Sequence, residues 1–207
     1  DTSTNKIVIA YRDDGNSERG TAVVATIDSS DNSVTYGSPV VYHTSESSGS
    51  FRSAAFVPAT AVNSDDSANS IVVAFKDGGD SGRGKAVVGV VSGTGNTSTT
   101  WGSVATFNTG STDQHLTVVN DTNAKRLLIA YKDSGNSSYG TAVVASVNST
   151  DSSISFGSET VFNSSNTDEI CGVFDPDTNK IILCFQDAGD SNKSKSVVAT
   201  ISGTSVS

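Results

Sequence analysis

The stretch Leu-Leu-Ile-Ala-Tyr-Lys-Asp at residues 127–133, continued by Gly-Asn-Ser at 135–137, is one of four copies of a single pattern. In each copy an apolar run ends in an aromatic residue, a further residue and an aspartate, and a turn containing Gly-[Asn/Asp]-Ser follows. The other copies occupy residues 7–17, 71–81 and 181–191. The aspartates that end the runs are Asp13, Asp77, Asp133 and Asp187, at separations of 64, 56 and 54 residues. The chain is therefore a tandem repeat.

Each repeat is interpreted as a unit of four strands, named A to D. The quoted run is strand B, and strand C follows the turn, as at residues 141–145. An aromatic-Gly-Ser triplet marks strand D at 36–38, 101–103 and 156–158, and strand A of the next unit follows at 53–56, 116–119 and 171–174. Continuous apolar runs in B and C indicate strands buried on both faces. The sequence predicts an all-β fold, a β-propeller with four repeat units of up to four antiparallel strands.

All 207 residues are expected to form one propeller segment, with units at about 1–48, 49–110, 111–165 and 166–207. Residues 1–6 match the turn between strands A and B at 175–180, and residues 205–207 match 153–155. The first unit would then lack its inner strand A, and the last unit its outer strand D. Because unpaired strand edges are usually covered, we expect a piece of a longer or closed propeller.

Charge and hydropathy exclude several classes of partner. The chain carries 22 acidic and 13 basic side chains, a net charge of −9, so neither a nucleic acid nor an anionic membrane is expected to bind. No apolar run approaches the roughly 20 residues that cross a bilayer. The sequence has neither a Met nor a signal peptide, which predicts a mature chain or an excised segment.

Three strings of the third unit carry a resemblance to known repeats: Ala-Tyr-Lys-Asp-Ser-Gly-Asn-Ser-Ser-Tyr-Gly-Thr-Ala-Val-Val at 130–144, Ser-Ile-Ser-Phe-Gly-Ser at 153–158 and Val-Phe-Asn-Ser at 161–164. They resemble the tandem β-propeller repeats of large extracellular and phage-tail proteins of marine microbes. The resemblance implies a propeller over essentially the whole chain, secreted or on the surface of a cell, virion or appendage. It implies a surface or adhesive role and no defined reaction.

A partial similarity to sialidases lies in the turn motif Asp-x-Gly-x-Ser, which resembles the Asp-box Ser-x-Asp-x-Gly-x-Thr-Trp. Here the leading Ser is Tyr or Phe, the closing Trp is missing, and the motif follows strand B instead of strand C. A sialidase-like site uses three arginines, and Arg52 alone among the five arginines is expected on an inner strand. Asp168 and Glu169 are neighbours and should point to opposite faces, so they are not expected to form an acid–base pair.

We therefore expect an extracellular, non-catalytic module that binds a glycan or a protein, or a structural repeat of a larger surface assembly. The alternative is a sialidase-like glycoside hydrolase or lyase whose catalytic residues lie partly outside this sequence.

Two interpretations of the four turns after strand B stay open. In the first, the aspartate accepts loop N–H bonds, the glycine takes a positive φ, and Asn or Ser closes the turn. In the second, Asp13, Asp77, Asp133 and Asp187 supply oxygens to calcium, which takes about six to eight. No turn has a dense Asp-x-Asp-x-Asp pattern. No other cofactor is expected, and His43 and His115 lie too far apart in the repeat for a zinc site.

The turns between strands B and C and the connections from strand D to strand A are expected on one face. One variable position of the B–C turns would place Arg19, Arg83, Tyr139 and Lys193 around it. Such side chains stack on sugars or pair with carboxylates and sulfates, although solvated loop side chains are the simpler interpretation. The D–A connections would add Arg52, Asp113, Gln114, His115, Asp168 and Glu169 at the mouth of a central channel. The expected partner is a glycan or protein on a cell surface, or the remainder of a longer chain.

Cys171 and Cys184 are the only cysteines and lie at equal distances from the centre of the expected turn at 175–180. They should face each other across a hairpin, as a disulfide or as two buried thiols. A disulfide would indicate an oxidising compartment. Tyr36, Trp101 and Phe156 share one position, which favours packing between units over stacking on a sugar. Asn-x-Ser/Thr sequons, relevant only in a eukaryotic secretory host, occur at Asn96, Asn120, Asn136, Asn148, Asn163 and Asn192.

Overall fold

The computed structural model describes residues 6–46, 52–58, 70–92, 95 and 97–207. Within these ranges the regular structure consists of antiparallel β-strands and short 3-10 turns, which confirms the all-β prediction. The same ranges contain no helix that is long and apolar enough to span a membrane. Residues 1–5, the predicted unit boundary at 48/49 and the sequon residue Asn96 lie outside them.

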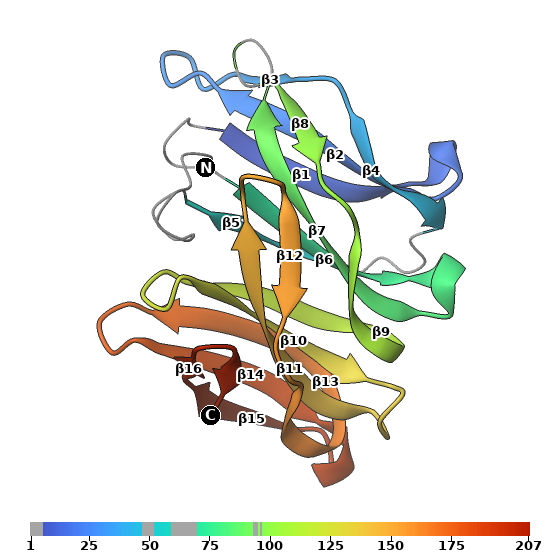
Figure 1. The fold of residues 1–207 in the computed structure, drawn as a ribbon, viewed down its shortest axis with the longest axis vertical. Helices are drawn as coiled ribbons and strands as arrows, with labels where there is room; N and C mark the ends of the chain where they lie inside the picture. Colours follow the sequence, from blue (N-terminus) through green and yellow to red (C-terminus); the bar gives the residue numbers. More distant parts are fainter. Residues whose placement is uncertain (1–5, 47–51, 59–69, 93–94, 96) are drawn as a thin grey trace.

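The strands follow one another as four units (Figure 1). Unit 1 comprises β1 (Lys6–Asp13), β2 (Arg19–Ile27), β3 (Val34–Tyr36) and β4 (Val40–Glu46). Unit 2 comprises β5 (Arg52–Val57), β6 (Ser70–Asp77), β7 (Arg83–Ser92), β8 (Ser98–Trp101) and the first part of β9 (Ala105–Asp121). Unit 3 comprises the rest of β9, β10 (Arg126–Asp133), β11 (Tyr139–Asn148), β12 (Ser153–Phe156) and the first part of β13 (Thr160–Asp175). Unit 4 comprises the rest of β13, β14 (Lys180–Asp187), β15 (Lys193–Ala199), β16 (Ile201–Ser202) and β17 (Ser205–Val206).

Two strands, β9 and β13, each belong to two units. The first part of β9 pairs with β7, and its second part pairs with β10. In the same way β13 pairs first with β11 and then with β14. In units 2 and 3 the second part of strand D therefore continues without a break into strand A of the next unit, and the predicted boundaries at 110/111 and 165/166 fall inside continuous strands. These shared strands join units 2 to 4 into one eleven-stranded sheet.

Strand D is interrupted at the aromatic-Gly-Ser triplet, where β8 ends at Trp101. A β-carbon at Gly102 would overlap the backbone carbonyl oxygen of Ser152, in the turn between strands C and D of unit 3. Two equivalent glycines meet the next unit in the same way, Gly37 against Thr97 and Gly157 against Thr204. The glycine of the triplet therefore permits a close approach between neighbouring units.

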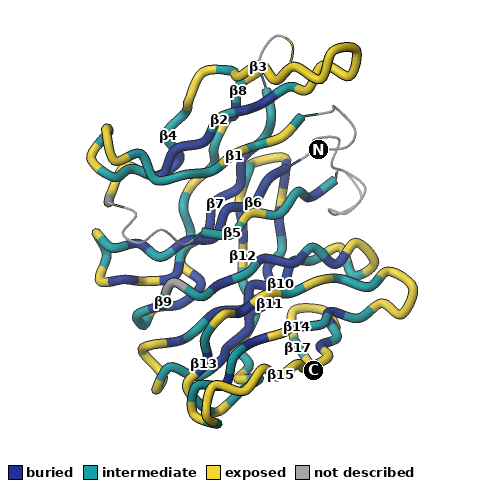
Figure 2. The backbone as a smooth tube through the Cα atoms, turned by 180° about the vertical axis from the view of Figure 1, so that it is seen from behind, coloured by how far each residue is buried: buried dark blue, intermediate teal, exposed yellow. Residues whose placement is uncertain are grey.

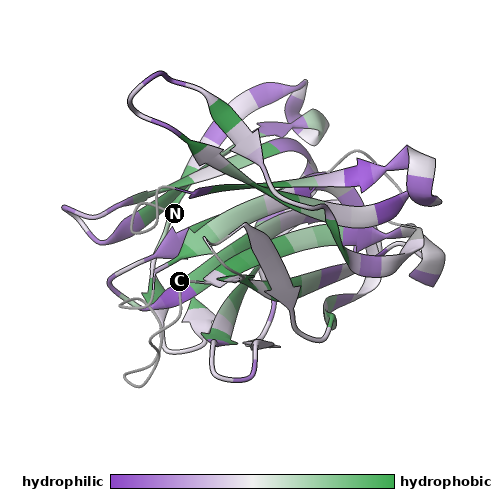
Figure 3. Cartoon of the chain, turned by 90° about the horizontal axis from the view of Figure 1, so that it is seen from above, coloured by the Kyte–Doolittle hydropathy of each residue, from purple (hydrophilic) through white to green (hydrophobic). Residues whose placement is uncertain are grey.

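Three apolar clusters lie between consecutive units. The cluster of units 1 and 2 contains Ala22 and Phe75, that of units 2 and 3 contains Val72 and Ile129, and that of units 3 and 4 contains residues of β10, β11, β14 and β15. The four units are stacked one on another, and the buried residues lie along the central strands of this stack (Figure 2). The hydrophobic residues lie along the same central strands (Figure 3). The core is thus distributed between units and not within them.

Each unit has two different faces because side chains along a strand alternate. On β10, Leu127, Ile129 and Tyr131 belong to the cluster shared with unit 2. Leu128 and Ala130 belong to the cluster shared with unit 4. We call the face toward the preceding unit the N-side face and the face toward the following unit the C-side face.

The aromatic residues of the triplets lie on the N-side faces. The Trp101 ring centroid lies 5.2 Å from that of Tyr42 in unit 1, and the Phe156 centroid lies 5.9 Å from that of Phe107 in unit 2. These two residues pack between units, as the sequence predicts. Tyr36 of unit 1 is 65% exposed.

Candidate functional site

The four B–C turns have one backbone geometry. Strand pairing places the motif aspartate opposite the variable residue six positions later, as Asp133 opposite Tyr139. In units 1, 2 and 4 the turn contains a 3-10 helix: η1 (Asp14–Asn16), η3 (Gly78–Asp80) and η4 (Ala188–Asp190). In all four turns the motif serine has a positive φ of 55–57°, at Ser17, Ser81, Ser137 and Ser191, and the residue after it also has a positive φ. The predicted positive φ at the motif glycine is therefore wrong: the serine ends the short helix in the left-handed conformation.

In units 3 and 4 the motif aspartate caps its own turn, as turn chemistry predicts, whereas Asp13 and Asp77 make no side-chain cap hydrogen bond. Asp133 Oδ1 accepts a hydrogen bond from Gly135 N at 3.0 Å. Asp187 Oδ1 accepts hydrogen bonds from Gly189 N and Asp190 N, each at 3.1 Å. These two aspartates are buried, and the side chain of Asp77 is inaccessible to solvent. The motif aspartates of units 3 and 4 therefore have a structural role inside their turns.

In units 2 and 4 a lysine lies between two aspartates of the turn. Lys85 Nζ lies 2.7 Å from Asp77 Oδ2 and 2.8 Å from Asp80 Oδ2. In unit 4, Lys195 Nζ lies 2.7 Å from Asp187 Oδ2 and 3.0 Å from Asp190 Oδ2. Units 1 and 3 carry neutral residues at the equivalent positions, Asn16 with Thr21 and Asn136 with Thr141. The lysine between two aspartates therefore occurs in alternate units, while the turn of unit 1 has other ion pairs, of Arg12 with Asp14 and Glu18.

The predicted calcium ligands lie in different surroundings. Lysine ammonium groups contact Asp77 and Asp187, whereas Asp133 also accepts a hydrogen bond from Asn108 Nδ2 at 3.1 Å. Asp13 is half-buried. In the part of the chain that the structure describes, no group of three or more His, Cys, Asp or Glu side chains is placed to hold a metal ion. Calcium binding stays a prediction.

Acidification is expected to weaken the turn of unit 4 through Asp187. Hydrogen bonds from Lys195 and then Ser165 lower the pKa of Asp187 from its ordinary 3.8 to about 2. Because the pKa is lowered in the folded state, the stabilisation is complete above about pH 4 and is lost as the pH falls through about 2. A Lys195→Met variant should lose part of this pH dependence, measured as the thermal midpoint across that range. Lys193→Met, which removes only an exposed partner of Asp190, is the control; equal curves for the two variants contradict the role of Lys195.

The D–A connections are bonded to the B–C turns, so the two form one continuous edge. Thr112 N donates to Gly82 O at 2.7 Å, and Gly135 N donates to Ser111 O at 3.0 Å. The single segment 111–112 thus contacts the turn of unit 2 and the turn of unit 3. At the previous junction, His43 Nε2 of β4 lies 3.0 Å from Asp77 Oδ2. Each connection observed here ties one turn to a neighbouring unit.

The residues predicted to line this edge occupy equivalent positions of the four turns. Arg83 and Lys193 are exposed, and Arg19 and Tyr139 are half-buried. Arg83 Nη1 lies 2.9 Å from Asp80 Oδ1, and its Nε donates to Thr109 O at 3.2 Å. Lys193 Nζ lies 2.9 Å from Asp190 Oδ1. These contacts hold the charged groups against their turns while leaving Arg83 and Lys193 accessible to solvent.

His115 lies in a polar cluster at the junction of units 3 and 4. Its Nε2 lies 3.6 Å from Asp168 Oδ1, and its Nδ1 accepts a hydrogen bond from Glu169 N at 3.1 Å. Lys132 Nζ lies 2.6 Å from Asp168 Oδ1 and 3.7 Å from Asp113 Oδ2. The sequence predicts all of these residues at the mouth of a channel except Lys132. Lys132 is missed because a lysine at the polar end of an apolar strand looks like any other solvent-exposed lysine. The side chain of Gln114 lies outside the described part of the structure.

Asp168 and Glu169 do not point to opposite faces, and that prediction is wrong. The pairing of β13 with β14 shifts register between Asp168 and Cys171, and Glu169 has a φ of +50°. This bulge changes the direction of the side chains. Glu169 Oε1 consequently lies 3.9 Å from His115 Nδ1, on the same histidine that Asp168 approaches. The cluster is a polar contact between two units that brings three carboxylates to one lysine and one histidine.

Arg52 lies apart from this cluster, beside Tyr42. Burial raises the pKa of the Tyr42 hydroxyl, and the positive charge of Arg52 partly opposes that rise. Arg52 is at the start of β5 and Tyr42 is in β4, so this contact joins unit 1 to unit 2. The six predicted ligand-binding residues therefore do not form one group.

Cys171 and Cys184 are directly opposite each other, as the turn arithmetic predicts. Both are free thiols and both are exposed, so the structure has neither the disulfide nor the burial that the sequence suggests. The two thiols are exposed because both side chains lie on the C-side face of unit 4, and the described structure has no following unit to cover that face.

The sequons differ in accessibility. Asn136, Asn148 and Asn192 are exposed. Asn120 Nδ2 donates to Phe56 O at 3.0 Å, and Asn163 Nδ2 donates to Thr167 Oγ1 at 2.9 Å. These two amides thus already donate to the fold, whereas the three exposed ones have solvent around them.

Comparisons with known protein families, with curated proteins and with solved structures gave no match to this chain.

Proposed function

We propose that the four units are consecutive blades of a β-propeller. Two observations support this assignment. The units are antiparallel and follow one another along the chain, and consecutive units pack face to face through apolar clusters. Blades that are buried on both faces by their neighbours have this arrangement.

In this proposal the module is extracellular and non-catalytic, and it binds an anionic glycan at the edge formed by the B–C turns and D–A connections. The observation that carries it is the placement of Arg83 at this edge. Its guanidinium is held in position by Asp80 and Thr109 O, yet 44% of its side chain is exposed. A pre-positioned arginine can pair with a carboxylate or sulfate through two parallel hydrogen bonds, and neighbouring aromatic and basic side chains add contacts.

The edge is rigid enough for recognition because it is internally bonded. The hydrogen bonds of Thr112 with Gly82 and of Gly135 with Ser111 fix adjacent turns relative to each other. Rigid positioning lowers the entropy that a ligand must overcome on binding. Neither calcium nor another cofactor enters this proposal.

Substitution of Arg83 tests the glycan proposal. A glycan array probed with the whole chain should give hits among sulfated or carboxylated sugars. Arg83→Ala should weaken these hits about tenfold, because a hydrogen bond to a charged group contributes about 1.5 kcal/mol. Tyr139→Ala should weaken them less, since Tyr139 is half-buried and presents less surface.

The matched control is Lys125→Ala. Lys125 is an exposed cation in the turn between strands A and B, at the opposite end of its unit. It should leave the hits unchanged. An array without hits contradicts glycan binding and favours a purely structural repeat. Equal weakening by Arg83→Ala and Lys125→Ala would mean that the glycans respond only to the net charge of the protein.

A further inference from the structure

The exposed apolar side chains of this protein gather on the two end faces of the stack. Among the described residues, eight large hydrophobic side chains are exposed. Strand pairing places five of them on the N-side face of unit 1: Ile7, Ile9, Ile27, Val34 and Tyr36. Val173 and Val198 lie on the C-side face of unit 4, and Val161 lies on neither. Contiguous apolar patches of this kind mark interaction surfaces.

The C-side face of unit 4 has the residues of an interface without its covering unit. Val198 is 58% exposed, whereas the equivalent Val88 and Val144 are 0% and 1% exposed, because units 3 and 4 cover them. Val173 is also 58% exposed, and its equivalent Val119 is 5% exposed. At both positions the residue of unit 3 is therefore buried by the following unit, and the residue of unit 4 is exposed.

The N-side face of unit 1 shows the complementary situation. Ile7 is 45% exposed, whereas the equivalent Leu127, packed against unit 2, is 1% exposed. Ile27 and Val34 face each other across β2 and β3 and are 44% and 45% exposed. Their equivalents in unit 3, Val147 and Ile154, are buried in the cluster shared with unit 2. Unit 1 thus presents the surface that units 2 to 4 use to contact a preceding unit.

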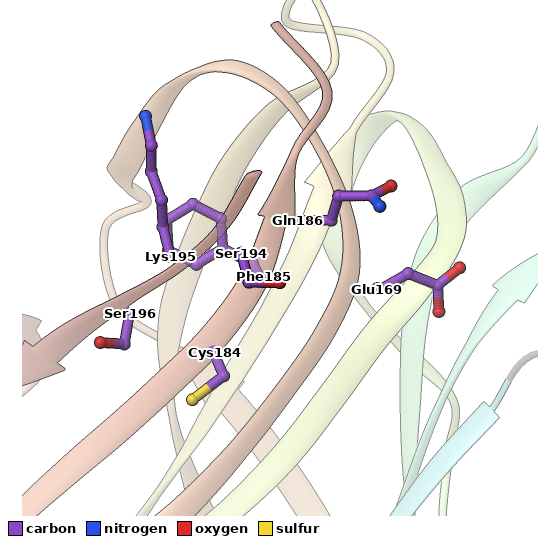
Figure 4. A pocket seen from close by; sticks show the side chains of 7 residues that line it. All are labelled: Glu169, Cys184, Phe185, Gln186, Ser194, Lys195 and Ser196. Carbon is purple, nitrogen blue, oxygen red and sulfur yellow. The ribbon is translucent and has the colours of Figure 1, made fainter. Parts of the chain in front are cut away.

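A hollow on the C-side face of unit 4 matches one particular side chain. The hollow has a volume of about 470 Å³, and its lining includes Cys184 and Ser196, which are opposite each other on β14 and β15 (Figure 4). In unit 3 the equivalent pair is Ala130 and Ala142, which is buried in one cluster with Phe185 of unit 4. In unit 2 the equivalent alanine pair shares a cluster with Tyr131 of unit 3. Small residues on one unit thus accommodate the strand-B aromatic residue of the next.

We propose that the C-side face of unit 4 binds the N-side face of unit 1 from a second copy of this chain. Tyr11, the strand-B aromatic residue of unit 1, then occupies the hollow beside Cys184 and Ser196. The contact repeats the one that joins consecutive units inside the chain. Because the two faces differ, copies associate head to tail, and they form a ring or an open array. The proposal rests on the packing between units and is independent of glycan binding.

Two single-face variants test the association. Light scattering on the size-fractionated whole chain should give a mass of at least two copies. Val198→Glu places a charge on one face and Ile7→Glu on the other, and each should weaken association by roughly tenfold or more. Alone, each variant should be monomeric at concentrations where the unmodified chain associates. Mixed, they should form a one-to-one pair, since each retains the face that the other has lost.

The control is Val161→Glu, at a valine that is 44% exposed and lies on neither end face. It should associate like the unmodified chain, and circular dichroism should show all three variants folded because the substituted side chains are exposed. Cys184 supplies a second readout: its reaction with a thiol reagent should slow as the protein concentration rises, because association covers it. A monomeric unmodified chain, a failure of the two blocked variants to pair, or an equal effect of Val161→Glu each overturns the proposal.

Discussion

Replacing Asp77 by alanine is expected to lower the free energy of unfolding by about 3 to 5 kcal/mol. The Asp77 side chain is 0% exposed, and its Oδ2 lies 2.7 Å from Lys85 Nζ and 3.0 Å from His43 Nε2. Removing the carboxylate takes the fully buried anion from His43 and from Lys85, which is 15% exposed, and leaves the 35%-exposed Asp80 to pair with the lysine. Breaking a buried ion pair in this way is strongly destabilising. Native proteins typically unfold at a cost of roughly 5–15 kcal/mol, so this loss would be a large share of the total stability.

Chemical denaturation of the Asp77→Ala variant measures this loss. Asp80→Ala is the matched control, because Asp80 contacts the same Lys85 Nζ at 2.8 Å but is 35% exposed. It should destabilise the protein less. Adding Lys85→Ala to Asp77→Ala should cause little further loss, because the lysine has then no buried anion to pair with. If Asp77→Ala costs no more than Asp80→Ala, the buried ion pair is not what stabilises the turn.

Gly102→Ala is expected to lower the free energy of unfolding by about 2 kcal/mol, the middle of the range for overpacking. The added β-carbon would overlap the carbonyl oxygen of Ser152, which belongs to the backbone of the next unit and cannot rotate away. Units 2 and 3 would have to separate at this point, and the apolar cluster between them would loosen.

Thermal and chemical denaturation of Gly102→Ala should be compared with Gly15→Ala. At Gly15 the nearest atom to an added β-carbon is Asp13 Oδ1 at 3.4 Å, an ordinary contact. The control therefore changes the same residue type without forcing a neighbour to move. Equal effects of the two substitutions would show that loss of backbone freedom, and not the approach of the next unit, determines the outcome.

The repeat itself predicts much of the local structure. The spacing of Asp13, Asp77, Asp133 and Asp187 identifies the hairpins of strands B and C, because an apolar run, a turn and a second apolar run are all local signals. The symmetric positions of Cys171 and Cys184 about their turn give the correct register. Such features depend on residues close in sequence.

Features that depend on a neighbouring unit are not visible in the sequence. The strands β9 and β13 are continuous because each pairs with two different hairpins. The local sequence pattern does not predict this double pairing. The bulge at Glu169 re-aims its side chain toward His115 of the preceding unit. Lys85, which lies between Asp77 and Asp80, belongs to the strand after the turn and not to the turn motif. The motif alone therefore suggests a calcium site at a place where the ammonium group of a lysine lies.

The lysine of the turns also gives the chain a second period. Units 1 and 3 share the string Gly-Thr-Ala-Val-Val-Ala at 20–25 and 140–145, and units 2 and 4 share the lysine between two aspartates. The chemistry of the turns thus repeats every two units, while the apolar interface repeats with every unit. A ligand that spans neighbouring turns would therefore meet two different chemical environments.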